Sequence, residues 1–189
     1  MIQKIRVKTI EGSDTIGESV LYDIVERLGI KIIHGVETVK VYRLEGITQK
    51  QAEVLAKKLF CEEINQTYSI NEPLIRGASS IIEISYKPGV MNPEIESILK
   101  AAKLLKINPK AVDSSREYAF YGEMARAGID NIVLKLNLFN PVIEHIVKEE
   151  PKTLLLKGIV GQTNTISIRK MSETNSNFMP SSPNSDFSF

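Results

Sequence analysis

The chain presents the same order of sequence features twice. In each half, a turn, a helix-like run, a Tyr-containing segment that ends in glycine, and an apolar run follow one another. Gly12 precedes Gly89 by 77 residues, and Gly46 precedes Gly122 by 76 residues. Matching features at a nearly constant spacing are typical of a duplicated structural unit. We therefore expect two copies of one small unit that pack together and share a core.

The first copy shows strand and helix patterns in alternation. Apolar residues alternate with charged ones in the first strand, and the first helix has an apolar stripe that is capped by Ser13 or Asp14. Thr48 and Gln51 form a capping box for the second helix. The expected elements are strand 5–10, helix 16–28, strand 37–44, a helix that opens at Thr48, and strand 64–70.

The second copy repeats this pattern with clearer boundaries. Asn92 is placed to cap a helix whose first position is Pro93. Gly128 interrupts the next helical pattern, which Asp130 is placed to restart. The expected elements are strand 81–86, a helix from 93 to 105, strand 112–121, a broken helix around 128, and strand 142–147.

The two copies define the predicted fold class, an α+β protein of ferredoxin-like character. Each β-α-β-α-β copy has its strands in an antiparallel or mixed sheet covered by helices on one face. The copies span residues 1–72 and 80–150 and pair as an intramolecular pseudo-dimer, joined by a short surface linker over 71–80. Two short strands are expected at 154–156 and 166–169, and the Ser-, Asn- and Pro-rich stretch 172–189 is expected to be disordered.

Composition limits the classes of partner. The chain has 24 Lys and Arg against 23 Asp and Glu, which disfavours nucleic-acid or membrane-surface binding because both need a basic field. Cys61 is the sole cysteine, so no internal disulfide forms, and a reducing compartment is expected. The sequence shows no signal segment and no membrane-length apolar run, so a cytoplasmic location is expected.

Motifs for catalysis are sparse. The sequence contains no Gly-Lys-Thr/Ser phosphate loop and no GxGxxG fingerprint, and His34 and His145 are far apart without ligand-spaced partners. Cys61 is expected to be a small packing residue, since free cysteines are usually buried. Tyr42 and Tyr118 occupy equivalent strand positions, where packing is favoured over RNA stacking. No catalytic, metal-binding or cofactor-binding residue is expected in this chain.

Several segments resemble a known family. The runs 4–7, 16–21, 28–30 and 39–46 are similar to the PurS-type small subunit of phosphoribosylformylglycinamidine (FGAM) synthase. The runs 86–93 and 139–145 are similar to the N-terminal region of the long, single-chain form of that enzyme, which carries two PurS-like units in tandem. Residues 157–169 resemble the start of the linker domain that follows, so residues 151–171 are expected to begin it.

The resemblance implies a role in purine biosynthesis. The family enzyme uses ATP, Mg²⁺ and glutamine to convert formylglycinamide ribonucleotide to its amidine. Its synthetase and glutaminase carry the catalytic groups, while PurS-like units bridge these two partners and help shape the ammonia passage. The chain is then either a separate subunit or part of a longer enzyme. A ligand-sensing module of the ACT or ferredoxin-like kind is the alternative, and requires a small ligand between the copies.

Position and resemblance together suggest which residues contact a partner. They lie at the turn before the first helix of each copy and at the start of the last predicted strand. The candidate interface residues are Gly12, Gly17, Pro88, Gly89, Val90, Asn92, Pro93, Asn140, Pro141 and His145.

Overall fold

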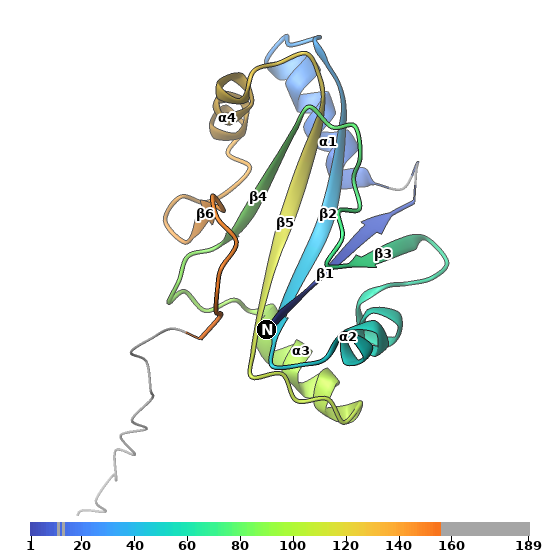
Figure 1. The fold of residues 1–189 in the computed structure, drawn as a ribbon. Helices are drawn as coiled ribbons and strands as arrows, with labels where there is room; N and C mark the ends of the chain where they lie inside the picture. Colours follow the sequence, from blue (N-terminus) through green and yellow to red (C-terminus); the bar gives the residue numbers. More distant parts are fainter. Residues whose placement is uncertain (11, 13, 156–189) are drawn as a thin grey trace, which may run out of the picture. The chain divides into compact units, whose positions relative to one another are not determined.

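The computed structural model describes residues 1–10, 12 and 14–155 of the chain, and these residues belong to one compact unit. The unit contains a six-stranded sheet in the order β3-β1-β2-β5-β4-β6, with every neighbouring pair antiparallel (Figure 1). Four α-helices complete it. The predicted α+β class is confirmed, and the arrangement is compatible with a ferredoxin-like fold.

The helices of the first half begin where their caps predict. The Asp14 side chain accepts a hydrogen bond from the Gly17 amide, and Thr48 and Gln51 form the predicted capping box. The first helix was expected to reach residue 28, but its last turn is π-helical. The elements are β1 (Ile2–Thr9), α1 (Thr15–Tyr22), the π-helical η1 (Asp23–Arg27), β2 (Ile33–Glu45), α2 (Gln49–Leu55), the π-helical η2 (Ala56–Phe60) and β3 (Gln66–Ile70).

The second half differs from the sequence prediction at its end. Helix α3 begins at Glu94 with Pro93 at its N-cap, one residue later than predicted, and Asn92 Oδ1 accepts a hydrogen bond from the Glu94 amide at 3.0 Å. The break predicted near Gly128 is wrong, because one continuous helix passes through it. The last strand is shorter than predicted and leaves Val142 exposed. The elements are β4 (Ser80–Tyr86), α3 (Glu94–Leu104), β5 (Ala111–Gly122), α4 (Arg126–Lys135) and β6 (Glu144–Ile146).

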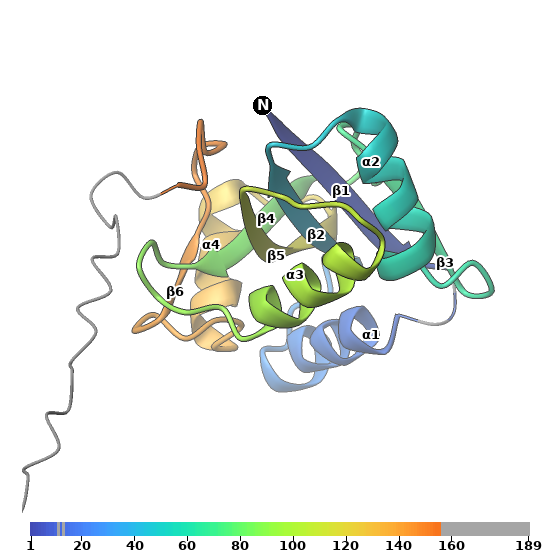
Figure 2. The same ribbon diagram turned by 90° about the horizontal axis from the view of Figure 1, so that it is seen from below.

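All four helices pack on one face of the sheet, as predicted (Figures 1 and 2). One apolar cluster joins α2 and α3 to the sheet, and a second joins α1 and α4, toward the opposite end in Figure 1. Tyr42 stacks on Phe60 with 4.0 Å between ring centroids, while Tyr118 and Cys61 are buried in the two clusters. The predicted packing roles of Tyr42, Tyr118 and Cys61 are confirmed.

The segment that joins β3 to β4 was predicted to be a surface linker, but it also buries an apolar side chain. Ile75 is only 6% exposed and packs on Val39, Val41 and Ala119, on the face opposite the helices. The central strands β2 and β5 carry apolar residues on both faces. The apolar residues on the face without helices must therefore also be shielded from water. The linker therefore provides a small apolar cover in the middle of an otherwise charged face.

The described residues after β6 run on without regular structure. Leu154 and Leu155 lie in no strand, contrary to prediction, and the Leu154 amide donates a hydrogen bond to Glu45 at 2.7 Å. The strand predicted at 166–169 and the stretch 172–189 lie outside the described residues. In the part of the chain that the structure describes, no helix has the length and apolar character needed to cross a membrane.

Candidate functional site: the charged face of the sheet

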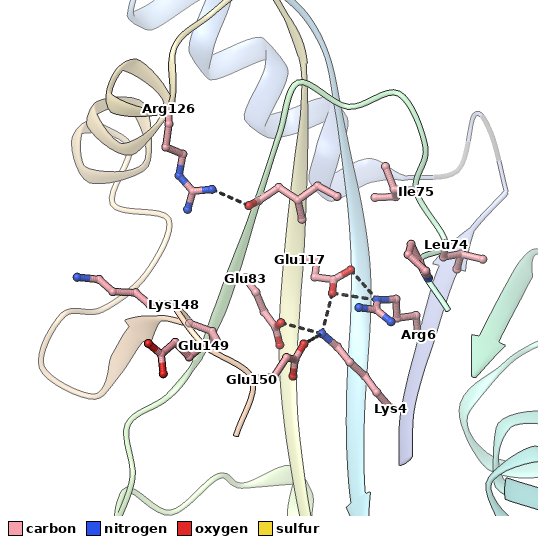
Figure 3. A pocket seen from close by; sticks show the side chains of 13 residues that line it. Lys4, Arg6, Leu74, Ile75, Glu83, Glu117, Arg126, Lys148, Glu149 and Glu150 are labelled. Atoms are coloured by element: carbon pink, nitrogen blue, oxygen red, sulfur yellow. Dashed lines mark hydrogen bonds and ion pairs between the residues drawn. The ribbon is translucent and has the colours of Figure 1, made fainter. Parts of the chain in front are cut away.

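The sheet face opposite the helices carries a cluster of charged side chains that are mostly withdrawn from solvent (Figure 3). Its members come from alternate positions of four strands and from the segment after β6. We call them the ion cluster: Lys4, Arg6, Arg43, Glu83, Glu117 and Glu150.

Arg43 lies at the centre of the ion cluster. Its residue is 1% exposed, and its Nη2 donates a hydrogen bond to Glu83 Oε2 at 2.8 Å. Its Nη1 donates to Ser115 Oγ at 3.0 Å, and its Nε donates to Glu150 Oε2 at 3.1 Å. A buried guanidinium is stable only where its charge and donors are satisfied, and these three partners meet that condition.

The long side chains of β1 extend across β2 to reach the second half of the sheet. Lys4 Nζ lies 3.1 Å from Glu83 Oε2 and 3.2 Å from Glu117 Oε1. Arg6 Nε donates to Glu117 Oε1 at 3.0 Å. Because β2 lies between β1 and β5, these contacts bind the first half of the chain to the second without involving the helices.

Contacts within the ion cluster lower the pKa values of Glu83 and Glu150. Burial alone would raise the pKa of Glu83, but hydrogen bonding and charge from Arg43, with further contributions from Ser115 and Lys4, lower it from 4.5 to about 2. Burial also opposes ionisation of Glu150, and its contacts with Lys4 and Arg43 again lower its pKa. Glu83 and Glu150 are therefore charged at neutral pH.

A cavity of about 510 Å³ lies beside the ion cluster on the same face. Leu74 and Ile75 form an apolar wall, and Arg126 on the other side donates from Nη1 to the Ile81 carbonyl at 3.0 Å (Figure 3). Lys148 and Glu149 close the rim. Most of the polar lining is charged side chains of both signs, which suits the cavity to binding a polar group.

A second cavity, of about 270 Å³, gathers half of the predicted interface residues. Pro88, Gly89, Val90, Asn92 and His145 all line it. Residues 87–90 form a tight turn in which the Val90 amide donates to the Lys87 carbonyl at 3.0 Å, with Gly89 at φ +87°. Proline followed by a glycine of positive φ is the pattern of a type II turn, so the glycine predicted for this turn is required by its backbone.

Three more of the predicted interface residues lie in neighbouring segments. Asn140 and Pro141 lie in the loop before β6, which the Lys87 ammonium joins to this turn by donating to the Pro141 carbonyl at 2.5 Å. Pro93 precedes α3 directly.

Gly12 and Gly17 do not line the second cavity. Gly12 lies before α1, and Gly17 lies in the first turn of that helix. Gly17 is packed so closely that a Cβ there would lie 2.5 Å from the Val36 carbonyl oxygen. The close packing of α1 on β2 therefore explains why position 17 is a glycine.

The two histidines stay apart in the fold. His34 is exposed on β2, whereas His145 is in β6, and its buried Nδ1 has no hydrogen-bond partner among the described residues. No group of three His, Cys, Asp or Glu residues within the described ranges is arranged to hold a metal ion.

The sequence analysis missed the ion cluster, although a signal for it is present. Lys4 and Arg6 alternate with Ile5 and Val7 along β1, and such alternation indicates a strand with one charged face. The anions stand on β4 and β5, almost 80 or more residues later in the chain. Their partnership with β1 depends on strand order, which no local pattern reveals.

Comparison with models of known protein families yields no match, and neither does comparison with curated protein sequences.

Proposed function

We propose that the chain is a non-catalytic, PurS-like component of phosphoribosylformylglycinamidine synthase. In this role it bridges the synthetase and glutaminase components in the cytoplasm and helps shape the ammonia passage between them. ATP, Mg²⁺ and glutamine then bind to those partners. The ordered series of PurS-like segments along residues 2–147 is the observation that suggests this family.

The arrangement of the strands supports a tandem pair of PurS-like units. If β1, β2 and β3 are equated with β4, β5 and β6, the order β3-β1-β2-β5-β4-β6 is the same from either edge. Tyr42 and Tyr118 are 76 residues apart in sequence, and in the β2–β5 ladder Lys40 pairs with Arg116, which are also 76 apart. A two-fold axis through the Lys40–Arg116 pair would therefore relate the two halves as a pseudo-dimer. This register supports the part of the proposal that pairs two PurS-like units.

Two loops near the second cavity provide a surface that suits a protein partner. Met91 is 88% exposed in the loop between β4 and α3, and Val142 is exposed in the loop before β6. Lys87 joins these loops through its ammonium and through its amide, which donates to the Ile143 carbonyl at 2.9 Å. In the proposed assembly a partner covers these two exposed apolar side chains.

A reconstitution experiment tests the proposal. The full chain, tagged and expressed in its source cells, is expected to co-purify with an FGAM synthetase and a glutaminase identified by mass spectrometry. The recovered assembly should lose glutamine-dependent FGAM synthesis when the chain is removed and regain it when purified chain is added back. Full glutamine-dependent activity without the chain would overturn the scaffold role.

A matched pair of variants tests the loop surface. Met91→Glu is expected to weaken recovery of the partners at least tenfold, because a charge would be buried in the contact. Ile64→Glu is the control, since Ile64 is also 88% exposed and lies on the loop before β3. Equal recovery with both variants would exclude the loop between β4 and α3 from the interface.

The 510 Å³ cavity supports the second candidate function, a small-ligand regulatory module. Its charged wall combines Lys4 and Arg6 from the first half with Glu83 and Glu117 from the second, so a ligand there would lie between the halves. A thermal-shift panel of amino acids and nucleotides separates the two functions. A ligand at 100 times its dissociation constant should stabilise the chain by about 2.7 kcal/mol, whereas a pure scaffold should not respond to ligands that lack a phosphate group.

A further inference from the structure

A third cavity lies on the helix-covered face, at the middle of the sheet where β2 and β5 pair. Its volume is about 180 Å³. Lys40 of β2 and Arg116 of β5 line it, and they are direct cross-strand partners. Like charges at opposite positions of an antiparallel pair repel and destabilise the sheet. The pair therefore needs a compensating negative charge.

Glu94 makes a direct ion pair with one of the two cations. Lys40 Nζ lies 2.7 Å from the Glu94 carboxylate, which also accepts a hydrogen bond from Ser114 Oγ at 2.7 Å. Arg116 is half-buried and makes no hydrogen bond or ion pair with any described residue. Burial raises the pKa of Glu94, but contacts with Lys40 and Ser114 and the nearby charge of Arg116 lower it, so Arg116 interacts with this acid without a direct contact. In the described part of the chain, the Arg116 guanidinium is the cationic group of this cavity that makes no hydrogen bond.

Other polar groups around Arg116 complete a binding site for an anion. Glu144 also lines the cavity, but its Oε2 accepts a hydrogen bond from the Asn140 amide at 2.7 Å and is held toward that loop. Tyr86 and Tyr118 line the cavity too, and their hydroxyls donate to no described residue. A guanidinium with two tyrosyl hydroxyls matches the acceptor oxygens of a phosphate group.

We propose that this cavity binds a small oxyanion of the phosphate class, held by Arg116 with Tyr86 and Tyr118 as further donors. The bound charge relieves the repulsion between Lys40 and Arg116 and so stabilises the pairing of β2 with β5. The inference depends only on these side chains and holds whether or not the chain belongs to a purine-synthesising assembly.

Thermal unfolding of the full chain tests the site, with inorganic phosphate compared with chloride at equal ionic strength and pH 7. Phosphate at about 100 times its dissociation constant is expected to raise the melting temperature by about 5–10 °C. Glycerol 3-phosphate serves as a second probe, because a free phosphate ion and a phosphate monoester present the same oxygens. A response to either probe that requires Arg116 supports the site, and the two responses identify which form fits.

Two variants make the test specific. Arg116→Gln is expected to abolish the phosphate response and, because it removes the cross-strand repulsion, to keep or raise the melting temperature in chloride. Arg27→Gln is the control, since Arg27 is exposed in η1 and should leave the response unchanged. A wild-type chain that does not respond to either probe, or an Arg116→Gln variant that responds as strongly as the wild type, would overturn the proposal.

Discussion

The two faces of the sheet are built from the same strands but are held by different forces. On the helix-covered face, Ile5, Leu44 and Phe120 lie among buried apolar side chains. The removal of apolar area from water stabilises this face. On the other face, Lys4, Arg43 and the acids of β4 and β5 form the ion cluster. The strand period of two separates these environments by a single residue.

This difference bears on how each face tolerates change. An apolar core fails by degrees, because a truncated side chain leaves a cavity of limited size. A buried ion cluster is less tolerant, because each partner that is removed leaves another charge without compensation. The charged face also joins the two halves of the chain directly, so its side chains serve as a link between the halves.

The largest effect is expected on the helix-covered face. Phe120→Ala removes a side chain of 0% exposure from the cluster that joins α1 and α4 to the sheet, and should lower the free energy of unfolding by about 3–5 kcal/mol. Tyr22→Ala, at a position 66% exposed in α1, should change it by less than about 0.5 kcal/mol. Urea unfolding of both variants measures the contrast, and equal losses would contradict the assignment of this face as the core.

A comparable loss is expected when the ion cluster is broken on one side only. Arg43→Met leaves the Glu83 carboxylate in a site 10% exposed without its main partner, at a cost of about 3–4 kcal/mol. The double variant Arg43→Met/Glu83→Leu should recover most of that loss, because no uncompensated charge remains. A double variant less stable than Arg43→Met in urea unfolding would show that the ion cluster contributes net stability.

Acid should weaken the charged face selectively. The pKa of Glu83 is about 2 in the folded chain against an ordinary 4.5, so the unfolded state binds a proton first as the pH falls. The stabilisation is complete above about pH 5 and is lost progressively toward pH 2, a change of roughly 3 kcal/mol. The urea midpoint of Glu83→Gln should depend less on pH over this range, and an unchanged pH dependence would contradict the role of Glu83.

The smallest contrast concerns the apolar cover on the charged face. Ile75→Val and Ile82→Val each remove one methyl group, from the linker cover and from the helix-covered core respectively, and each should cost about 0.5–1.5 kcal/mol. Differential scanning calorimetry of the two proteins compares the two faces directly. If Ile82→Val lowered the stability and Ile75→Val did not, the linker would be a surface segment without a packing role.

Local patterns in the sequence determined the class of fold and several of its details. Asp14 and Thr48 cap helices as their positions predict, and the turn at Pro88–Gly89 has the predicted backbone, since these are interactions within four residues of each other. The packing roles of Tyr42 and Cys61 followed from the preference of strands for aromatic residues and the usual burial of free cysteines. The break expected at Gly128 was wrong, because helix propensity is a weak guide where tertiary packing supports the helix.

Only the tertiary structure decided which distant residues meet. The order β3-β1-β2-β5-β4-β6 brings Lys4 to Glu83 and Glu117, places Arg116 opposite Lys40, and separates Gly12 and Gly17 from the turn at Gly89. Charge and polarity are properties of each residue and are visible in the sequence. The energy of an ion pair depends on a distance of a few ångströms and on burial, and both are set by strand order and register.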